Sequence, residues 1–270
     1  MYQAQFFRCT TLSVVATALS LMAASALAQS PAPARPAQPP KCLVPPEQVA
    51  FDQPLARTSA RISAGLPLRV VAIGSSSTYG LGASSPAQSY PSQLEGELRR
   101  HFPGHALTVY NRGANGEEAA DMVARFQNGV IAENPHLVLW QVGTNSVLRG
   151  RPLDPHVDVL EEGIARLKAI HADVVLLNPQ YAPKVIAKPE AEGMVDLIAA
   201  TAKTEKVDLF DRFAMMRRWH DAQHLPFESF VTSDGLHMND WGYRCLAQTL
   251  GVAIAEAATR PATAVATRRR

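Results

Sequence analysis

Two hydrophobic patterns alternate along the middle of the chain. Short runs of apolar, often β-branched residues are typical of buried strands, and they occupy residues 68–73, 106–111, 136–142, 173–177 and 207–210. Longer segments with apolar residues at helical spacing occupy residues 92–102, 117–127, 155–171, 190–205, 213–224 and 239–257. This alternation predicts a three-layer α/β architecture, in which helices cover both faces of a mostly parallel, five-stranded sheet.

Residues 1–28 carry the pattern of a secretory signal peptide. Arg8 precedes an apolar run from Leu12 to Ala24, and Ala-Leu-Ala follows at residues 26–28. A charge, a short apolar core and small residues at the cleavage point are the parts of such a signal. The run is too short, and too often interrupted by Ser and Thr, for a stable membrane span. We therefore expect cleavage after Ala28 and export to the periplasm or out of the cell, with no stable membrane insertion afterwards.

Composition separates one folded domain from two irregular ends. Residues 29–44 are rich in Pro, Ala and Ser, which predicts a linker, and residues 259–270 form a basic tail expected to be disordered. Residues 45–258 between them have the length of a single domain. The formal net charge is +2, and Arg8 together with the arginines of the tail more than accounts for it. The domain therefore offers no basic surface for nucleic acid, and none is expected as a partner.

Three cysteines bear on the redox state of the protein. Cys9 would leave with the signal peptide, so Cys42 and Cys245 remain. An even pair in an oxidising compartment favours one disulfide, which would tie the end of the linker to the final helix. The alternative is two unpaired thiols. Neither cysteine has the spacing of a metal ligand.

Polar residues stand where the predicted strands end. They form Gly-Ser-Ser-Ser-Thr at 74–78, Asn-Arg-Gly-Ala-Asn-Gly-Glu at 111–117 and Gly-Thr-Asn-Ser at 143–146, and Asp-Gly-Leu-His at 234–237 precedes the last helix. Ligands of open α/β sheets bind beyond the carboxyl ends of the strands. A hydroxyl, backbone N–H groups, an amide and an Asp-x-x-His pair are the parts that acyl transfer requires. Taken alone, the first segment is equally consistent with an ordinary loop whose Ser caps a helix.

Together and in this order, the four segments resemble the motifs of the SGNH/GDSL hydrolases, which include esterases, lipases, thioesterases and carbohydrate deacetylases. The resemblance extends over about residues 69–257 and implies the flavodoxin-like fold of that family. It implies Ser76 as nucleophile, His237 as general base and Asp234 as the group that orients it. It also implies an oxyanion hole formed by the N–H groups of Ser76 and Gly116, with Gly113 as the alternative glycine, and by the Asn145 amide.

Two positions depart from the family pattern. Ser75 stands where the family usually has Asp before the nucleophile, and Ser146 follows Asn145 where Asp is common. Neither position performs the central chemistry, so we expect altered hydrogen bonding in the loops with activity retained. The departures leave the substrate class open.

The function that the resemblance implies is that of an exported serine esterase acting on short-chain acyl or acetylated carbohydrate esters. No metal and no organic cofactor is expected, and the only expected partner is the small-molecule or glycan ester. Two alternatives use the same residues: a cell-envelope glycan O-acetyltransferase, and a glycan-binding protein without catalytic activity.

One further pattern points elsewhere. His220 and His224 are four residues apart with Asp221 between them, which echoes a zinc-binding helix. The glutamate base and the third ligand of such helices are missing, so a solvated helix face is the better prediction.

Overall fold

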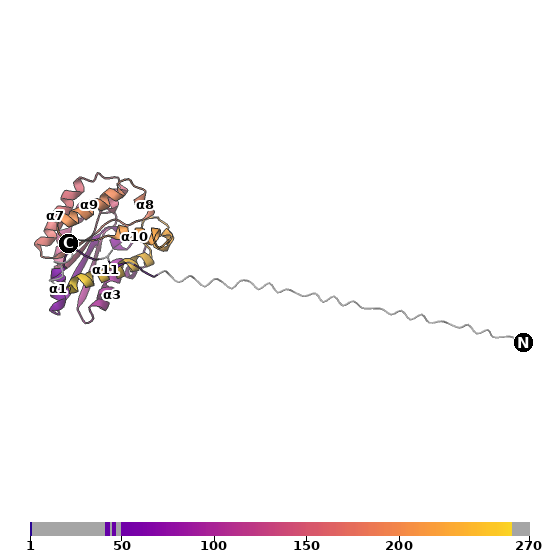
Figure 1. The fold of residues 1–270 in the computed structure, drawn as a ribbon, viewed down its shortest axis with the longest axis horizontal. Helices are drawn as coiled ribbons and strands as arrows, with labels where there is room; N and C mark the ends of the chain where they lie inside the picture. The colour runs from indigo at the N-terminus through magenta and orange to yellow at the C-terminus, as the bar shows by residue number, and fades with distance from the viewer. Residues whose placement is uncertain (2–40, 44, 47–49, 261–270) are drawn as a thin grey trace. The chain divides into compact units, whose positions relative to one another are not determined.

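A five-stranded, all-parallel sheet forms the centre of the protein (Figure 1). The structure is a computed structural model, and it describes residues 1, 41–43, 45–46 and 50–260. The strands are β1 Leu68–Gly74, β2 Leu107–Gly113, β3 Leu137–Gln141, β4 Asp173–Leu177 and β5 Asp208–Phe210, in the order β2-β1-β3-β4-β5. The expected signal peptide apart from Met1, most of the expected linker and nearly all of the expected tail lie outside the described residues.

The central strands are buried along almost their whole length. Val70, Val71, Ala72 and Ile73 of β1 are fully buried, as are the residues of β3. Strands covered on both faces show such continuous apolar runs, because neither side of the sheet meets water. The predicted α/β class and the five parallel strands are confirmed.

The strand order determines where the helices lie. The step from β1 to β2 runs in one direction across the sheet, and every later step runs in the other. Because parallel crossovers are right-handed, this reversal places the connecting helices on opposite faces. One layer contains α1 Ala56–Ser63, α3 Tyr90–His101 and α11 Asp240–Thr259, in which α11 packs against both partners. The other contains α4 Ala119–Ala124, α7 Pro155–Ala169 and α9 Ala191–Thr204, in which α7 packs against both partners.

Shorter elements fill the connections, several of them beside the carboxyl edge of the sheet. They are α2 Ser76–Tyr79, α5 Phe126–Gly129, α6 Thr144–Leu148, α8 Pro183–Ile186 and α10 Arg212–Asp221, with single 3-10 turns at Pro86–Gln88, Ile131–Glu133 and Phe227–Ser229. The helix predicted over 117–127 is divided between α4 and α5, because Arg125 has φ −102° and ψ 9°. The helix predicted over 213–224 ends at Asp221.

A disulfide joins Cys42 to Cys245 on α11, with the two Cα atoms 5.4 Å apart. The predicted pairing is confirmed. Cys245 is fully buried, so the bond fixes Cys42 to the core face of the last helix. Among the described residues, no helix is long and apolar enough to cross a membrane.

Candidate active site

The candidate site lies at the carboxyl edge of the sheet, where the strand order reverses. Ser76 follows β1 and Asn145 follows β3, the two strands on either side of the reversal. Gly116 follows β2, the other neighbour of β1. Open α/β sheets bind ligands at this switch point, because the connections before and after it diverge to opposite faces and leave a crevice.

A buried network holds the loop that carries Ser76. The backbone N–H and the hydroxyl of Ser75 donate to Gln141 Oε1, at 2.9 and 3.1 Å, and the Thr78 hydroxyl donates to the same oxygen at 3.2 Å. Ser75 and Ser77 are buried, whereas Ser76 is half-buried. Gln141 thus satisfies the hydrogen bonding of the serine that stands where the family usually has Asp.

The three residues assigned to the triad lie in one hydrogen-bonded line. His237 Nε2 is 2.8 Å from Ser76 Oγ, and His237 Nδ1 is 2.5 Å from Asp234 Oδ2. His237 is buried, with an exposed fraction of 6%. A histidine bonded through one ring nitrogen to a carboxylate and through the other to a serine can accept the hydroxyl proton while the carboxylate stabilises the resulting cation.

The Asp234 carboxylate is held by the backbone that follows it. Its Oδ1 accepts hydrogen bonds from the N–H groups of Leu236 and His237, at 2.8 and 2.9 Å, and from the Thr232 hydroxyl at 2.7 Å. Burial raises the pKa of Asp234, but the hydrogen bonds from His237, Thr232 and Leu236 outweigh it and hold the pKa well below its ordinary value. The carboxylate therefore stays ionised at neutral pH.

The loop bearing Asp234 and His237 is a tight turn that is hydrogen-bonded to residues of the segment after β4. Gly235 has φ +68°, a conformation that favours glycine, and its carbonyl accepts from the Lys184 N–H at 2.9 Å. Gln180 Nε2 donates to the Leu236 carbonyl at 3.2 Å, and Gln180 Oε1 accepts from the fully buried Arg212 at 2.9 Å. These bonds fix the turn against the sheet.

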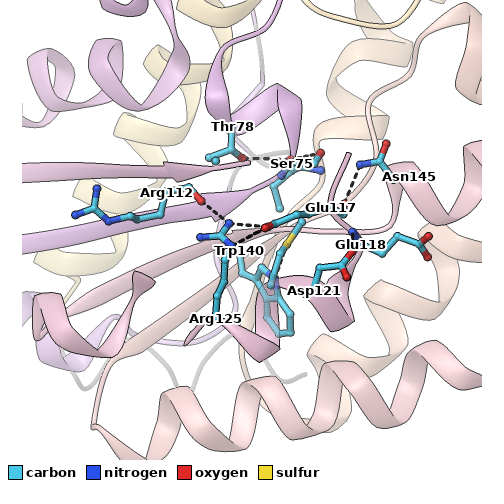
Figure 2. Close-up of polar contacts among 12 residues, drawn as sticks. Ser75, Thr78, Arg112, Glu117, Glu118, Asp121, Arg125, Trp140 and Asn145 are labelled. Atoms are coloured by element: carbon cyan, nitrogen blue, oxygen red, sulfur yellow. Dashed lines mark hydrogen bonds and ion pairs between the residues drawn. The ribbon is translucent and has the colours of Figure 1, made fainter. Parts of the chain in front are cut away.

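The amide of Asn145 is oriented by the loop that follows β2. Asn145 Nδ2 donates to the Glu117 carbonyl at 2.8 Å, as Figure 2 shows. The second hydrogen of that amide remains for another acceptor. Gly116 has φ +79°, and its N–H makes no hydrogen bond within the described residues. The N–H of Gly113, the alternative glycine, donates instead to Asn111 Oδ1 at 3.0 Å.

Three residues that support this site from a distance were not predicted from the sequence. Gln141, Gln180 and Arg212 are buried and polar, and they lie at or after the ends of β3, β4 and β5. The one signal for them was a glutamine that ends an otherwise apolar strand. Ser146, where Asp is common, donates to Glu118 Oε2 at 3.0 Å, so a carboxylate from α4's N-cap faces that position.

A groove adjoins the triad. It has a volume of about 540 Å³ and is lined by residues 79–86 with Asn111 and Gly113. Its lining contains no charged side chain, and it includes the 56% exposed Tyr79 and the 42% exposed Leu81. The triad residues do not themselves line the groove, but its lining residue Gly82 packs against His237, since a Cβ on Gly82 would lie 2.9 Å from His237 Cβ.

The two histidines of the zinc-like pattern are not one turn apart on a helix. His224 lies beyond the end of α10 with φ +54°, and the ring of His220 stacks on Phe227 with centroids 4.1 Å apart. The prediction of a solvated helix face is wrong for His220, which is half-buried. Within the described residues, no cluster of three or more His, Cys, Asp or Glu has a metal-binding arrangement.

Comparisons with known proteins identify the family of the chain. Residues 41–260 match the model of the non-GDSL lipase-like family. An arylesterase of Vibrio mimicus is 29% identical over 151 residues, which is 56% of this chain and 70% of the relative. An acetylxylan esterase of Geobacillus stearothermophilus is 26% identical over 102 residues, 34% of this chain and 47% of the relative.

The fold is also found among solved structures. A two-domain esterase active on acetylated mannans superposes with a TM-score of 0.66 at 18% identity, over 80% of this chain and 57% of that one. The chain thus spans about half the length of two of these three proteins. The match of the family model to most of the chain shows that the protein belongs to the non-GDSL lipase-like family, in agreement with its resemblance to the SGNH/GDSL hydrolases.

Proposed function

We propose that the protein is an exported serine esterase that releases short acyl groups, acetyl groups of carbohydrates among them. The observation that carries the proposal is the line of hydrogen bonds from Ser76 Oγ to His237 Nε2, 2.8 Å, and from His237 Nδ1 to Asp234 Oδ2, 2.5 Å. A serine hydroxyl is a weak nucleophile at its own pKa, and this arrangement supplies the base that activates it.

In the proposed reaction, Ser76 Oγ attacks the acyl carbonyl while its proton passes to His237 Nε2. Collapse of the tetrahedral intermediate breaks the ester bond, and the imidazolium returns the proton to the departing alcohol. Water then attacks the acyl-enzyme with His237 again as base, and the carboxylic acid leaves. Asp234 keeps the imidazole in the tautomer with a proton on Nδ1 and stabilises the cation.

The negative charge of the intermediate would be stabilised by three donors. They are the backbone N–H groups of Ser76 and Gly116 and the free hydrogen of the Asn145 amide. The Ser76 N–H starts a helix, where the first N–H groups have no intrahelical acceptor. Gly116 N–H is unpaired within the described residues, and Asn145 is oriented by Glu117 O. Such donors stabilise charge strongly because they need no reorganisation during the reaction.

The alcohol part of the substrate would lie in the groove beside His237. An uncharged lining of serines, an exposed aromatic ring and an amide suits a neutral, hydroxyl-rich molecule with apolar ring faces. A sugar has this chemistry, and the two carbohydrate esterases among the similar proteins act on acetylated xylan and acetylated mannans. The signal-like pattern of residues 1–28 and the Cys42–Cys245 disulfide support export.

The two alternative functions use the same geometry and make different products. A glycan O-acetyltransferase would pass the acyl group to a sugar hydroxyl instead of water, so an added alcohol acceptor would suppress release of free acid. A glycan-binding protein without activity would not need the Ser76–His237–Asp234 line of hydrogen bonds.

The test is hydrolysis of p-nitrophenyl esters from acetyl to palmitoyl beside acetylated oligosaccharides, with Ser76→Ala as control. The proposal expects the highest kcat/KM for acetyl or other short acyl groups, and loss of that activity in the variant. Activity that survives in Ser76→Ala, or its absence from the wild type on every ester, would overturn the proposal.

A further inference from the structure

We propose that Arg149 and Arg125 are positioning residues, two guanidinium groups that together clamp residues 113–118 and so aim the Gly116 N–H and the Asn145 amide at one point. The inference rests on the proposed function, in which these two groups stabilise the oxyanion. It adds to it the means by which a loop with little structure of its own keeps its shape.

The loop makes few backbone hydrogen bonds of its own. Ala114 N–H donates to Gly74 O at 2.9 Å, and Glu117 N–H reaches Ala114 O only at 3.5 Å. Gly116 has φ +79°, and the backbone of a glycine can adopt many other conformations as well. A segment of this kind needs side-chain contacts from elsewhere to hold one geometry. The geometry matters because a displacement of about 1 Å in a catalytic site can lower the rate roughly a hundredfold.

Arg149 holds the loop from α6. Its Nη2 donates to the Gly116 carbonyl at 2.8 Å, and its Nη1 pairs with Glu118 Oε1 at 2.5 Å. Arg149 follows Asn145 by four residues, and the Arg149 N–H donates to Asn145 O at 3.0 Å. One turn of helix therefore presents both the amide and the guanidinium to the same loop. The hydrogen bond to Gly116 O sets the orientation of the peptide that joins Gly116 to Glu117. This peptide adjoins, across the Gly116 Cα, the one that carries the Gly116 N–H, so holding it restricts the direction of that N–H.

Arg125 holds the loop from the end of α4. Its Nε donates to both carboxylate oxygens of Glu117 at 2.8 Å, and its Nη2 donates to the Arg112 carbonyl at 2.7 Å (Figure 2). One planar guanidinium thus joins the residue before the loop to a residue near its end. The backbone carbonyl of Glu117 accepts a hydrogen bond from the Asn145 amide at 2.8 Å. By holding the Glu117 side chain, Arg125 therefore also helps to position the Asn145 amide.

These ion pairs differ from ordinary surface pairs, which contribute little to stability. Each guanidinium binds a backbone carbonyl as well as a carboxylate, and the planar fork of arginine matches this pair of acceptors where lysine cannot. The two carboxylates are neighbours, Glu117 and Glu118, and each is held by a different arginine. Glu118 is also 3.4 Å from Arg151 Nε, so Arg149 is the one of its two arginines that binds the loop backbone as well.

The test compares Arg149→Gln and Arg149→Lys with Arg99→Gln. Arg99 is a matched control, since it too binds one carboxylate, Glu95, and one carbonyl, Leu107 O, both at 2.7 Å, but at the amino end of β2. Its side chain is 52% exposed against 43% for Arg149. Three readouts are measured: kcat and KM on p-nitrophenyl acetate, the rate of Ser76 labelling by a fluorophosphonate, and amide hydrogen exchange of residues 113–118.

The clamp predicts that Arg149→Gln lowers kcat and the labelling rate by about 10- to 100-fold with KM changed less than about threefold. Exchange within residues 113–118 should accelerate by about tenfold or more, Arg149→Lys should recover part of each effect, and Arg99→Gln should match the wild type. Arg125→Gln should act in the same direction. Unchanged exchange in Arg149→Gln, or a loss confined to KM, would overturn the inference. A wild type without ester hydrolysis or labelling would refute the proposed function, and the exchange experiment would still decide the clamp.

Discussion

The two edges of the sheet use polar residues in opposite ways. At the carboxyl edge, Ser76 and His237 bond to each other beside a groove, and the serine remains half-buried. At the amino edge, His136, Asp173 and Asp208 accept hydrogen bonds from backbone N–H groups, of the neighbouring strand β1 for His136 and of residues 53–58 for the two aspartates. At one edge two side chains on separate elements bond to each other, whereas at the other edge polar side chains bond to the backbone of the chain.

The amino edge shows what a structural use of a polar side chain looks like. Asp173 accepts from the N–H groups of Arg57 and Thr58, at 3.2 and 2.7 Å, and from the Thr58 hydroxyl at 2.8 Å, so it caps the first turn of α1 from outside the helix. Asp208 accepts from the Gln53 N–H at 2.8 Å. A polar residue at a strand end therefore indicates a functional site only where its side chain can still hydrogen-bond to groups other than the backbone.

The largest effect is expected from His237→Ala. Removing the base should lower kcat/KM on a short-chain ester by about 10⁴-fold or more, because the residues of a triad act as one unit. Asp234→Asn should be roughly ten- to a hundredfold milder, since losing the acid alone leaves the base in place. Circular dichroism should show both variants folded. Equal losses in the two variants would argue against these separate roles.

Asn145→Ala should have a smaller effect, of about 10²- to 10³-fold on kcat, which is the typical result of removing one oxyanion donor. KM should change little, because the amide acts on charge that develops in the transition state. Steady-state kinetics on p-nitrophenyl acetate measures the split. A loss that falls entirely on KM would assign Asn145 to substrate binding instead.

At the amino edge, Asp173→Ala should cost stability and leave activity within about twofold. The N–H groups of the first turn of α1 would lose their acceptor, and losing a cap costs about 0.5–2 kcal/mol. Urea unfolding measures this loss of stability. Asp173→Asn should lose less, because its amide oxygen can still accept some of these hydrogen bonds. A large fall in kcat without a change in stability would contradict the distinction between the two edges.

A further prediction concerns the pH dependence of stability alone, through the titration of His136. Burial, with the nearby Arg61, Arg69 and Arg57, lowers the pKa of His136 from 6.5 to about 4. The Arg69 N–H donates to its Nδ1 at 2.9 Å, so the folded protein requires the neutral ring. Between pH 6.5 and about 4 the unfolded chain binds a proton that the folded chain does not. Stability should therefore fall as the pH drops through this window.

Unfolding of wild type and of His136→Gln across this window isolates the effect. Burial raises the pKa of Asp208 to about 6, which makes stability fall as the pH rises toward 6 and so opposes it. The difference between the two proteins removes that contribution. An identical pH dependence in both would refute the assignment to His136.

The parts that could be predicted from the sequence are those encoded by local patterns. The buried strands could be predicted because each is a run of apolar residues. The contact between Asp234 and His237 could be predicted because the two residues are only three positions apart. The helix α1 was missed because its residues, Ala56–Ser63, are mostly polar and its first turn is capped by Asp173, more than a hundred residues away. The split between α4 and α5 at Arg125 had no signal in the apolar spacing.

The supports of the site were hidden for the same reason. Gln141 contacts Ser75 across 66 positions of sequence, and Arg149 contacts Gly116 across 33. Such contacts depend on which strands become neighbours, and the order β2-β1-β3 is set by packing, not by a motif. The sequence indicated which residues do the proposed chemistry, but not which residues hold them in place.

The most direct test of the central claim compares Ser76→Ala with Ser77→Ala. The two serines are adjacent, but Ser76 Oγ lies 2.8 Å from His237 Nε2, whereas Ser77 is buried with 1% of its surface exposed. We predict that Ser76→Ala loses ester hydrolysis by about 10⁴-fold or more while remaining folded, and that Ser77→Ala keeps most of its kcat/KM. An active Ser76→Ala beside an inactive, folded Ser77→Ala would contradict the account.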